Sequence, residues 1–294
     1  MDFVTIFFDD KIEINLLKLQ ALSFKYVDET LVNNIYLIHN DVTRYNFKEL
    51  IECYPESMKK KVNGINVLKK KDYKTSCNEH KIHKFLAANL VKSEYYLVLD
   101  TKTHFLKNIV RGDFFDENEK PRLFTCSPGN MIKHYYSCLD YYNIKCPFNY
   151  EENAGNKLIS VSPHLLSKSD ALEMIKYITK KEGTTFLDFF IKSGDHVAEF
   201  YLYSTYLIFA NKIGNYRLSP KNSRSIGVGP ITGWNSCEYN CGILLKQPNI
   251  KIFGLDKKAI ETIMADKDTN FLLDFYANFY DEDVCAFIKN ELFV

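Results

Sequence analysis

The chain lacks the features that mark secreted or membrane-spanning proteins. Its 294 residues contain no apolar run near the roughly 20 residues that a membrane-spanning helix needs. The N-terminus has neither the basic start nor the small-residue cleavage site of a signal peptide, so we expect a cytoplasmic protein. Peripheral contact with the inner face of a membrane stays open. The net charge of +1 gives no electrostatic argument for nucleic acid as a partner.

Several catalytic and metal-binding patterns are also missing. The 8 cysteines include no C-x-x-C pair, and the nearest two are Cys237 and Cys241, so we expect reduced thiols rather than a disulfide framework or a zinc site. There is no G-x-S-x-G, no P-loop pattern and no G-x-G-x-x-G after the first apolar run. These absences argue against a serine hydrolase, a P-loop nucleotidase and a dinucleotide-binding Rossmann domain.

The N-terminal part of the chain does show apolar strands alternating with amphipathic helices. Strands are predicted at Phe3–Phe8, Asn34–His39, Ile65–Leu68 and Tyr95–Asp100, with helices near 12–24, 47–53 and 79–90. This order predicts the α/β class, with a mostly parallel central sheet built from right-handed crossovers and flanked by helices.

The second half is irregular and rich in aromatic residues. It predicts strands at Arg122–Cys126, Leu158–Ser162 and Asn249–Phe253, and helices near 131–142, 168–180, 188–192 and 197–210. Pro163 is expected to break a strand before the helix that Ser167 or Ser169 caps. No linker or repeat divides the chain, so we expect a single domain over residues 1–294.

Asp100 is the most informative residue, because it ends an apolar run that reads as a strand buried on both faces. In open α/β sheets, ligands bind outside the carboxyl ends of the strands, so Asp100 should face a ligand crevice. A carboxylate is costly to bury there unless it meets a metal ion, a hydroxyl-rich ligand or a cation. The alternative is a helix-capping or turn aspartate.

Three segments, taken in order, resemble GT-A-type glycosyltransferases from bacterial capsule and lipooligosaccharide loci. They are Val4–Asp10, Tyr95–Lys102 with its D-x-D-like strand end, and Ala198–Tyr203, which is similar to the family's E-[FY]-x-L-Y helix start. The resemblance implies a GT-A-like domain that moves a sugar from a nucleoside-diphosphate sugar to a hydroxyl of a bacterial surface glycan or glycolipid. Residues 1–110 would then form the nucleotide-binding half and residues 111–294 the acceptor-binding half.

The same resemblance implies a Mn²⁺ or Mg²⁺ ion, which would neutralise the leaving diphosphate as a Lewis acid. Asp100 and Asp256 are the metal-ligand candidates. The sequence departs from the family pattern at Lys102, which stands where the second acid of D-x-D would be. Lys102 could supply a positive charge to the diphosphate directly, or it could be a solvated turn lysine.

Glu199 is the candidate general base that takes the proton of the acceptor hydroxyl, by its match to the family motif. We expect Asp195 to cap the helix and to share a face with His196 and Glu199. His196 is the competing base, because its ordinary pKa already lies near neutrality. The alternative for Glu199 is a first-turn acid favoured by the helix dipole.

The remaining candidates would contact the two substrates. Polar or aromatic residues at the ends of the first two strands would bind the donor base, ribose and diphosphate, and these are Phe7, Asp9 and Asn40, together with Asp100 and Lys102. Acceptor contacts are expected from His164, Tyr203 and Trp234, although structural roles for His164 and Trp234 stay open. Two other functions also stay open: a non-catalytic nucleotide- or glycan-binding scaffold on a degenerate GT-A fold, and a nucleotidyltransferase.

Overall fold

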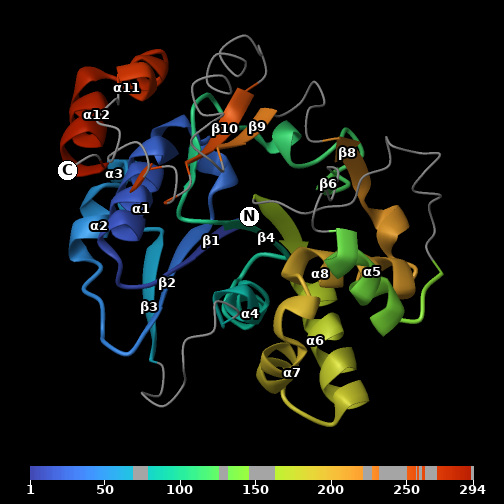
Figure 1. Cartoon of the computed structure of the whole chain (residues 1–294). Helices are drawn as coiled ribbons and strands as arrows, with labels where there is room; N and C mark the ends of the chain where they lie inside the picture. Colours follow the sequence, from blue (N-terminus) through green and yellow to red (C-terminus); the bar gives the residue numbers. More distant parts are fainter. Residues whose placement is uncertain are drawn as a thin grey trace.

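The computed structural model describes residues 1–68, 79–125, 132–145, 163–220, 227–231, 250–255, 257, 260–261 and 270–292. At its centre is a sheet of five strands in the order β3-β2-β1-β4-β7 (Figure 1). These strands are β1 (Asp2–Phe7), β2 (Asn34–Asp41), β3 (Val62–Leu68), β4 (Tyr95–Leu99) and β7 (His164–Ser167). The first four run parallel, and β7 runs antiparallel to β4. The expected α/β class with a mostly parallel, helix-flanked sheet is confirmed.

The strand order reverses between β1 and β4. From β1, the chain places β2 and β3 on one side and then adds β4 on the other side. Such a reversal leaves a crevice at the carboxyl ends of the two central strands, where ligands bind in open α/β sheets. The fold therefore singles out the ends of β1 and β4.

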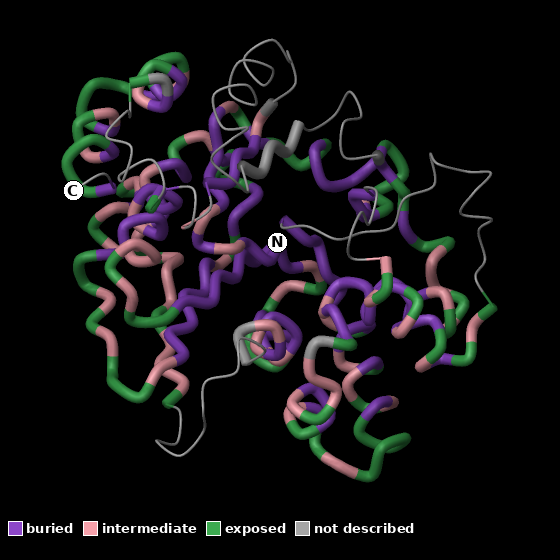
Figure 2. Tube along the Cα trace, in the orientation of Figure 1, coloured by how far each residue is buried: buried purple, intermediate pink, exposed green. Residues whose placement is uncertain are grey.

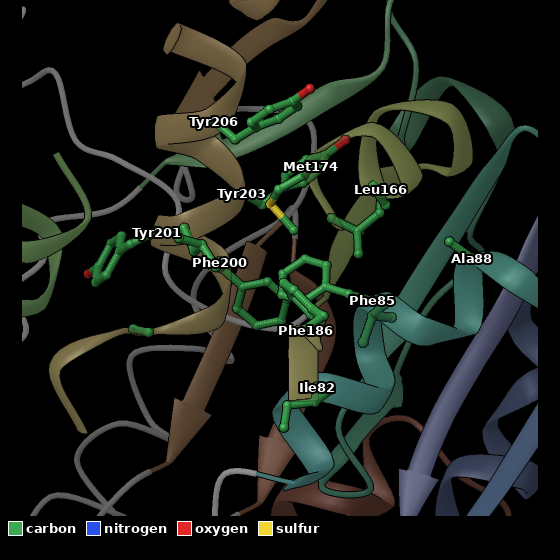
Figure 3. Close-up of a cluster of buried hydrophobic side chains, with 14 of the residues drawn as sticks. Ile82, Phe85, Ala88, Leu166, Met174, Phe186, Phe200, Tyr201, Tyr203 and Tyr206 are labelled. Carbon is green, nitrogen blue, oxygen red and sulfur yellow. The ribbon is translucent and has the colours of Figure 1, made fainter. Parts of the chain in front are cut away.

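Alternate residues of β1 face two different cores, as the period of two in a strand requires. Val4 and Ile6 pack into a cluster under α4 (Glu79–Leu86). This cluster also takes in residues of four further helices, which are α5 (Ile132–Tyr141), α6 (Lys168–Glu182), α7 (Phe186–Ser193) and α8 (Glu199–Phe209). Figure 3 shows Phe85 of α4 pointing toward Phe186 of α7 and Phe200 of α8. The α8 helix is thus held against α4, close to the sheet.

The opposite face of the sheet is covered by α1 (Lys11–Ser23) and its neighbours. Phe3 and Phe7 lie in this second cluster, where the ring of Phe24 packs edge-on against Phe3 and Phe105. A third cluster joins α1 to the C-terminal helices α11 (Asn270–Ala277) and α12 (Glu282–Phe287) and to the π-helix Ile288–Leu292. Figure 2 shows the central strands buried beneath more exposed helices.

Smaller elements complete the described chain. Two short sheets have the orders β5-β10-β9 and β6-β8. Their strands are β5 (Thr103–Phe105), β6 (Arg122–Thr125), β8 (Arg217–Pro220), β9 (Gly227–Ile231) and β10 (Ile250–Leu255). The remaining helices are α2 (Lys48–Glu52), α3 (Glu56–Lys59) and the 3₁₀ turns Phe24–Tyr26, Glu29–Leu31, Ala87–Asn89, Arg111–Asp113, Gly194–His196 and Ile213–Asn215. Within the described residues, no helix is both long enough and apolar enough to cross a bilayer.

Two local predictions in the second half are wrong. The residues after Pro163, expected to lie in a break before the helix, instead form β7, because His164–Ser167 pair with the edge of β4. Asp195 is not the N-cap of α8, since a 3₁₀ turn over Gly194–His196 intervenes and Ala198 holds that position without a side-chain bond. Ser167 does cap α6, accepting from Asp170 N. The strand expected at Leu158–Ser162 lies outside the described residues.

Candidate functional site

A cavity of about 310 Å³ opens at the carboxyl ends of β1 and β4. Its volume is at the lower end of the range for small-molecule sites. Its lining is strongly charged, with three carboxylates and three ammonium groups beside a threonine and two apolar residues: Glu13, Asp100, Glu199, Lys84, Lys102, Lys257, Thr101, Ile6 and Phe8. The cavity therefore lies at the strand reversal, and its lining includes three of the predicted residues, Asp100, Lys102 and Glu199.

The turn that carries Asp100 is fixed by a buried glutamine. Gln20 of α1 is fully buried, and its Nε2 donates to the backbone oxygens of Asp100 at 2.8 Å and of Thr103 at 2.7 Å. Its Oε1 accepts from Thr5 Oγ1 of β1 at 2.7 Å. Because every polar atom of such a buried amide needs a partner, these bonds hold the turn in one place relative to β1.

Lys84 joins the two predicted acids of the site. Its Nζ lies 2.8 Å from Asp100 Oδ1 and 3.1 Å from Glu199 Oε1, and its side chain is only 6% exposed. The ammonium also lies 4.9 Å from the centre of the Phe200 ring, a cation–π distance. Burial alone would lower the pKa of Lys84, but the charges of Asp100 and Glu199 raise it above its ordinary value. Lys84 is therefore a fully charged residue between two carboxylates.

Glu199 is the first residue of α8, and its side chain is 12% exposed. Burial opposes its ionisation, but the charge of Lys84, a backbone hydrogen bond at Glu199 and the charge of Lys81 outweigh this effect and lower the pKa of the carboxyl. Glu199 is therefore held as a carboxylate. A lowered pKa also makes it a weaker base than an ordinary glutamate.

The opposite wall of the cavity is formed from the start of α1. Asp10 caps that helix, with Oδ1 accepting from the backbone N–H groups of Ile12 and Glu13 at 3.1 Å each. Glu13 Oε2 accepts a hydrogen bond from Thr101 Oγ1. Burial raises the pKa of Glu13, and the nearby charges of Asp10 and Asp100 act in the same direction.

Two lysines at this wall are about one-third exposed. Lys102 Nζ lies 3.8 Å from Asp100 Oδ2, and its side chain is 34% exposed. Lys257 Nζ lies 2.5 Å from Asp10 Oδ2, and its side chain is 35% exposed. The hydrogen bond with Asp10 raises the pKa of Lys257.

Residues 9–223 match the family described as "Family of unknown function (DUF6492)". The chain belongs to this family. A search of the curated proteins finds no match. Among solved structures, an active-site mutant of LgtC is similar over 87% of this chain and 87% of that chain, with a TM-score of 0.45 and 10% identity. The galactosyltransferase LgtC in complex with donor and acceptor sugar analogues is similar over 98% and 100%, with the same TM-score of 0.45 and 10% identity.

Several other predicted residues of this DUF6492 protein do not line the cavity. Phe7 is buried on the other face of the sheet, beside His39 and Tyr45, and its neighbour Phe8 lines the cavity instead. Asp9 is exposed, and its backbone N–H donates to Asp41 Oδ2 at 3.1 Å. Asn40 is 1% exposed, and within the described chain its side-chain nitrogen and oxygen have no hydrogen-bond partner.

The candidate acceptor residues also lie apart from the cavity. His164 is buried in β7 with its ring stacked on Phe200, at 3.3 Å between ring centres. Tyr203 is buried in the core, where its hydroxyl lies 2.9 Å from Tyr216 Oη and accepts from Ser167 N. His196 is exposed in the 3₁₀ turn before α8. Trp234 and Asp256 lie outside the described residues.

Among the lining residues that the sequence reasoning missed are Phe8, Glu13, Lys84 and Lys257, and the first three left only a faint signal. Lys84 shares its helix face with Ala87 and Ala88 at i+3 and i+4, which are small apolar positions that favour burial. Glu13 follows Asp10 by three residues, a spacing that reads as a capping box. Phe8 could have been found from strand alternation, because it points opposite to Phe7. Nothing local to Lys257 distinguishes it from other surface lysines.

The divalent cation implied by the D-x-D resemblance does not fit these side chains. Each oxygen of Asp100 has an ammonium beside it, Lys84 at 2.8 Å from Oδ1 and Lys102 at 3.8 Å from Oδ2. Mg²⁺ and Mn²⁺ need several oxygen ligands at close range, usually including carboxylates with free lone pairs. No group of three or more metal-ligating side chains occurs in the part of the chain that the structure describes.

Proposed function

We propose that this DUF6492 protein is a glycosyltransferase that moves a sugar from a nucleoside-diphosphate sugar to an acceptor hydroxyl. One observation carries the proposal. At the strand reversal, the carboxylates of Asp100 and Glu199, joined by Lys84, line the same cavity as two partly exposed lysines. Such a cavity offers hydrogen-bond acceptors for sugar hydroxyls and positive charge for a diphosphate in one enclosed space.

Asp100 and Glu199 are suited to bind sugar hydroxyls. Ionised carboxylates accept hydrogen bonds only, and those to charged acceptors are about twice as strong as neutral ones. Lys84 holds one oxygen of each carboxylate in place, so both carboxylates have a fixed direction before the ligand arrives. Preorganisation of this kind reduces the entropy lost on binding.

The leaving group determines the second requirement. When the glycosidic bond to the diphosphate breaks, negative charge grows on the departing oxygen, and fixed positive groups lower that barrier. Lys102 and Lys257 contribute such groups to the cavity wall. A nucleotidyltransferase would need similar positive charge, but its reaction takes place at the α-phosphorus of a nucleoside triphosphate. Comparing diphosphates with triphosphates as ligands therefore separates this function from sugar transfer.

The lowered pKa of Glu199 shapes its role. With Lys84 bound, Glu199 is a poor proton acceptor, so we assign it first to binding a hydroxyl of the sugar or acceptor. If the reaction inverts the anomeric configuration, Glu199 becomes the base when the substrate displaces Lys84 from Oε1. The resemblance of the sequence motifs is the basis for taking a bacterial surface glycan, of capsule or lipooligosaccharide type, as the acceptor class.

Thermal unfolding with a panel of ligands tests the proposal. We expect nucleoside diphosphates and nucleotide sugars to raise the melting temperature in a concentration-dependent way, because a ligand that binds only the folded state stabilises it. A response confined to triphosphates would support a nucleotidyltransferase, and no response to any nucleotide would support a scaffold. Either result would overturn the glycosyltransferase assignment.

A matched pair of variants links any activity to the cavity. Asp100→Asn should abolish sugar transfer from the donor found in the panel, measured as release of the nucleoside diphosphate. Asp274→Asn, on an exposed position of α11, removes the same charge elsewhere and should leave the rate unchanged. Equal rates for wild type and Asp100→Asn would remove this cavity from the reaction.

A further inference from the structure

We infer that the diphosphate in this cavity is neutralised by the ammonium groups of Lys102 and Lys257 and not by a divalent cation. The inference rests on the proposed function, because it concerns the phosphate end of the same donor. Three observations support it. The carboxylates of the cavity already have ammonium or hydroxyl partners, Lys102 and Lys257 lie at the same wall of the cavity, and both are more exposed than Lys84.

The carboxylates of the cavity are already engaged. Both oxygens of Asp100 have a lysine ammonium within 4 Å, and Glu199 Oε1 lies 3.1 Å from Lys84 Nζ. Glu13 accepts from Thr101 and is disposed to hold a proton by burial. A cation entering beside Asp100 would meet two ammonium groups of like charge before it reached a carboxylate oxygen.

The fold brings Lys102 and Lys257 to the same wall although they are distant in sequence. The antiparallel pairing of β5 with β10 places Thr103 opposite Gly254. One residue further, Leu255 N donates to Lys102 O at 3.0 Å, and Lys257 follows two positions later. Both side chains then line the cavity.

Lys102 and Lys257 differ from Lys84 in accessibility. Lys84 is 6% exposed and lies between two carboxylates, whereas Lys102 and Lys257 are 34% and 35% exposed. The ion pair of Lys102 with Asp100 Oδ2 spans 3.8 Å, whereas Lys84 and Lys257 each have a carboxylate oxygen within 2.8 Å, so Lys102 can turn toward an incoming anion at little cost. Lys257 is aimed by Asp10, whose other oxygen is fixed in capping α1.

Two lysine ammonium groups are suited to neutralise a diphosphate in place of a metal ion. Each ammonium is a compact point charge with three donors, which suits the several oxygens of a diphosphate without imposing a planar geometry. Binding through such groups should weaken as salt is added and should be insensitive to chelators.

Calorimetric titration with UDP and GDP, the latter in case the base differs, tests this inference. For the nucleotide that binds, we expect the dissociation constant to change less than twofold between EDTA and Mn²⁺ or Mg²⁺. Lys102→Gln and Lys257→Gln should each weaken binding at least tenfold, while binding of the parent nucleoside, which lacks phosphate, should not change.

Lys107→Gln is the matched control, because this lysine lines a different cavity, with Tyr26 and Lys251, and should leave the affinity for the nucleotide unchanged. Lys102→Gln is the variant less able to disturb the fold, because the ion pair of Lys102 with Asp100 Oδ2 is long, at 3.8 Å, and its side chain is 34% exposed. The melting temperature of each variant shows whether it is folded.

The outcomes separate this inference from the proposed function. Binding that disappears with EDTA and returns with Mn²⁺, or lysine variants that bind like wild type, would overturn the lysine assignment and leave the glycosyltransferase proposal standing. Failure of every nucleoside diphosphate and nucleotide sugar to bind, with or without metal, would overturn both.

Discussion

Lys84 shows how one buried charge can organise a site. An isolated ammonium in the protein interior would be costly, but Asp100 and Glu199 balance it at 2.8 and 3.1 Å. The arrangement holds the end of β4 and the start of α8 at a fixed separation. Lys84 is therefore a positioning residue for both carboxylates, whichever substrate the cavity binds.

Replacing Lys84 with Met should destabilise the fold by about 3–5 kcal/mol, because removing one partner of a buried ion pair leaves uncompensated charge. Urea unfolding near neutral pH measures the change. Lys102→Met is the control, and its partly exposed 3.8 Å contact predicts a loss of at most about 1 kcal/mol. Similar losses for the two variants would mean that the Lys84 bridge does not stabilise the protein.

The residues that the sequence could identify are those whose local context is distinctive. Asp100 ends a buried strand, and Glu199 opens a helix, so each carries a signal in its neighbours. Lys84 and Lys257 lie in the cavity only because α4 packs near β1 and because β10 pairs with β5. No short-range pattern encodes those contacts, which depend on the whole fold.

At the scale of elements, hydrophobic periodicity predicted the strands β1, β2 and β4, the second half of β3, and the helices α1, α2 and α4, but not the short helix α3. It failed where an element is defined by its partner. The strand β7 is four residues long and forms through pairing with β4, so its sequence alone reads as the end of a strand. The strand β3 also depends on its surroundings, because the ring of Phe47 packs over Gly64 in its middle.

Gly64→Ala should cost about 1–3 kcal/mol, as expected for overpacking a well-filled site. A Cβ at Gly64 would lie 2.3 Å from Cγ of Phe47, so the ring or the strand must move. Gly112→Ala is the control, because a Cβ there meets nothing within 4 Å. Chemical denaturation of both variants gives the comparison, and an unchanged stability for Gly64→Ala would show that Phe47 moves aside without cost.

At the scale of the molecule, the cavity is a meeting point of segments from most of the chain. Glu13, Lys84, Asp100, Glu199 and Lys257 come from α1, α4, the turn after β4, α8 and the region after β10. Their charges are coupled across these elements, so the stability of the whole fold should depend on their protonation. The carboxyls of Glu13 and Glu199 should change the pH dependence of folding stability in opposite directions.

The pKa of Glu13 is raised in the folded state, chiefly by burial, so the folded protein holds this proton more tightly than the unfolded chain does. Its contribution to stability is full below the unfolded pKa, about 4.3, and is lost as the pH rises through the folded value. The pKa of Glu199 is lowered, because the charge of Lys84, a backbone hydrogen bond and the charge of Lys81 outweigh burial. Its contribution is full above the unfolded pKa and is lost as the pH falls toward the folded value.

Glutamine at either position removes the titration, so the difference in unfolding free energy between variant and wild type should change with pH. As the pH rises from about 4 to about 7, Glu13→Gln should gain stability relative to wild type; as it rises from about 3 to about 5, Glu199→Gln should lose stability relative to wild type. Urea unfolding across those ranges measures both slopes. If the two variants gave slopes of the same sign, one of the two carboxyls would not have the environment described. If both slopes had the opposite sign to the expected one, Lys84 would be excluded as the group that keeps Glu199 ionised.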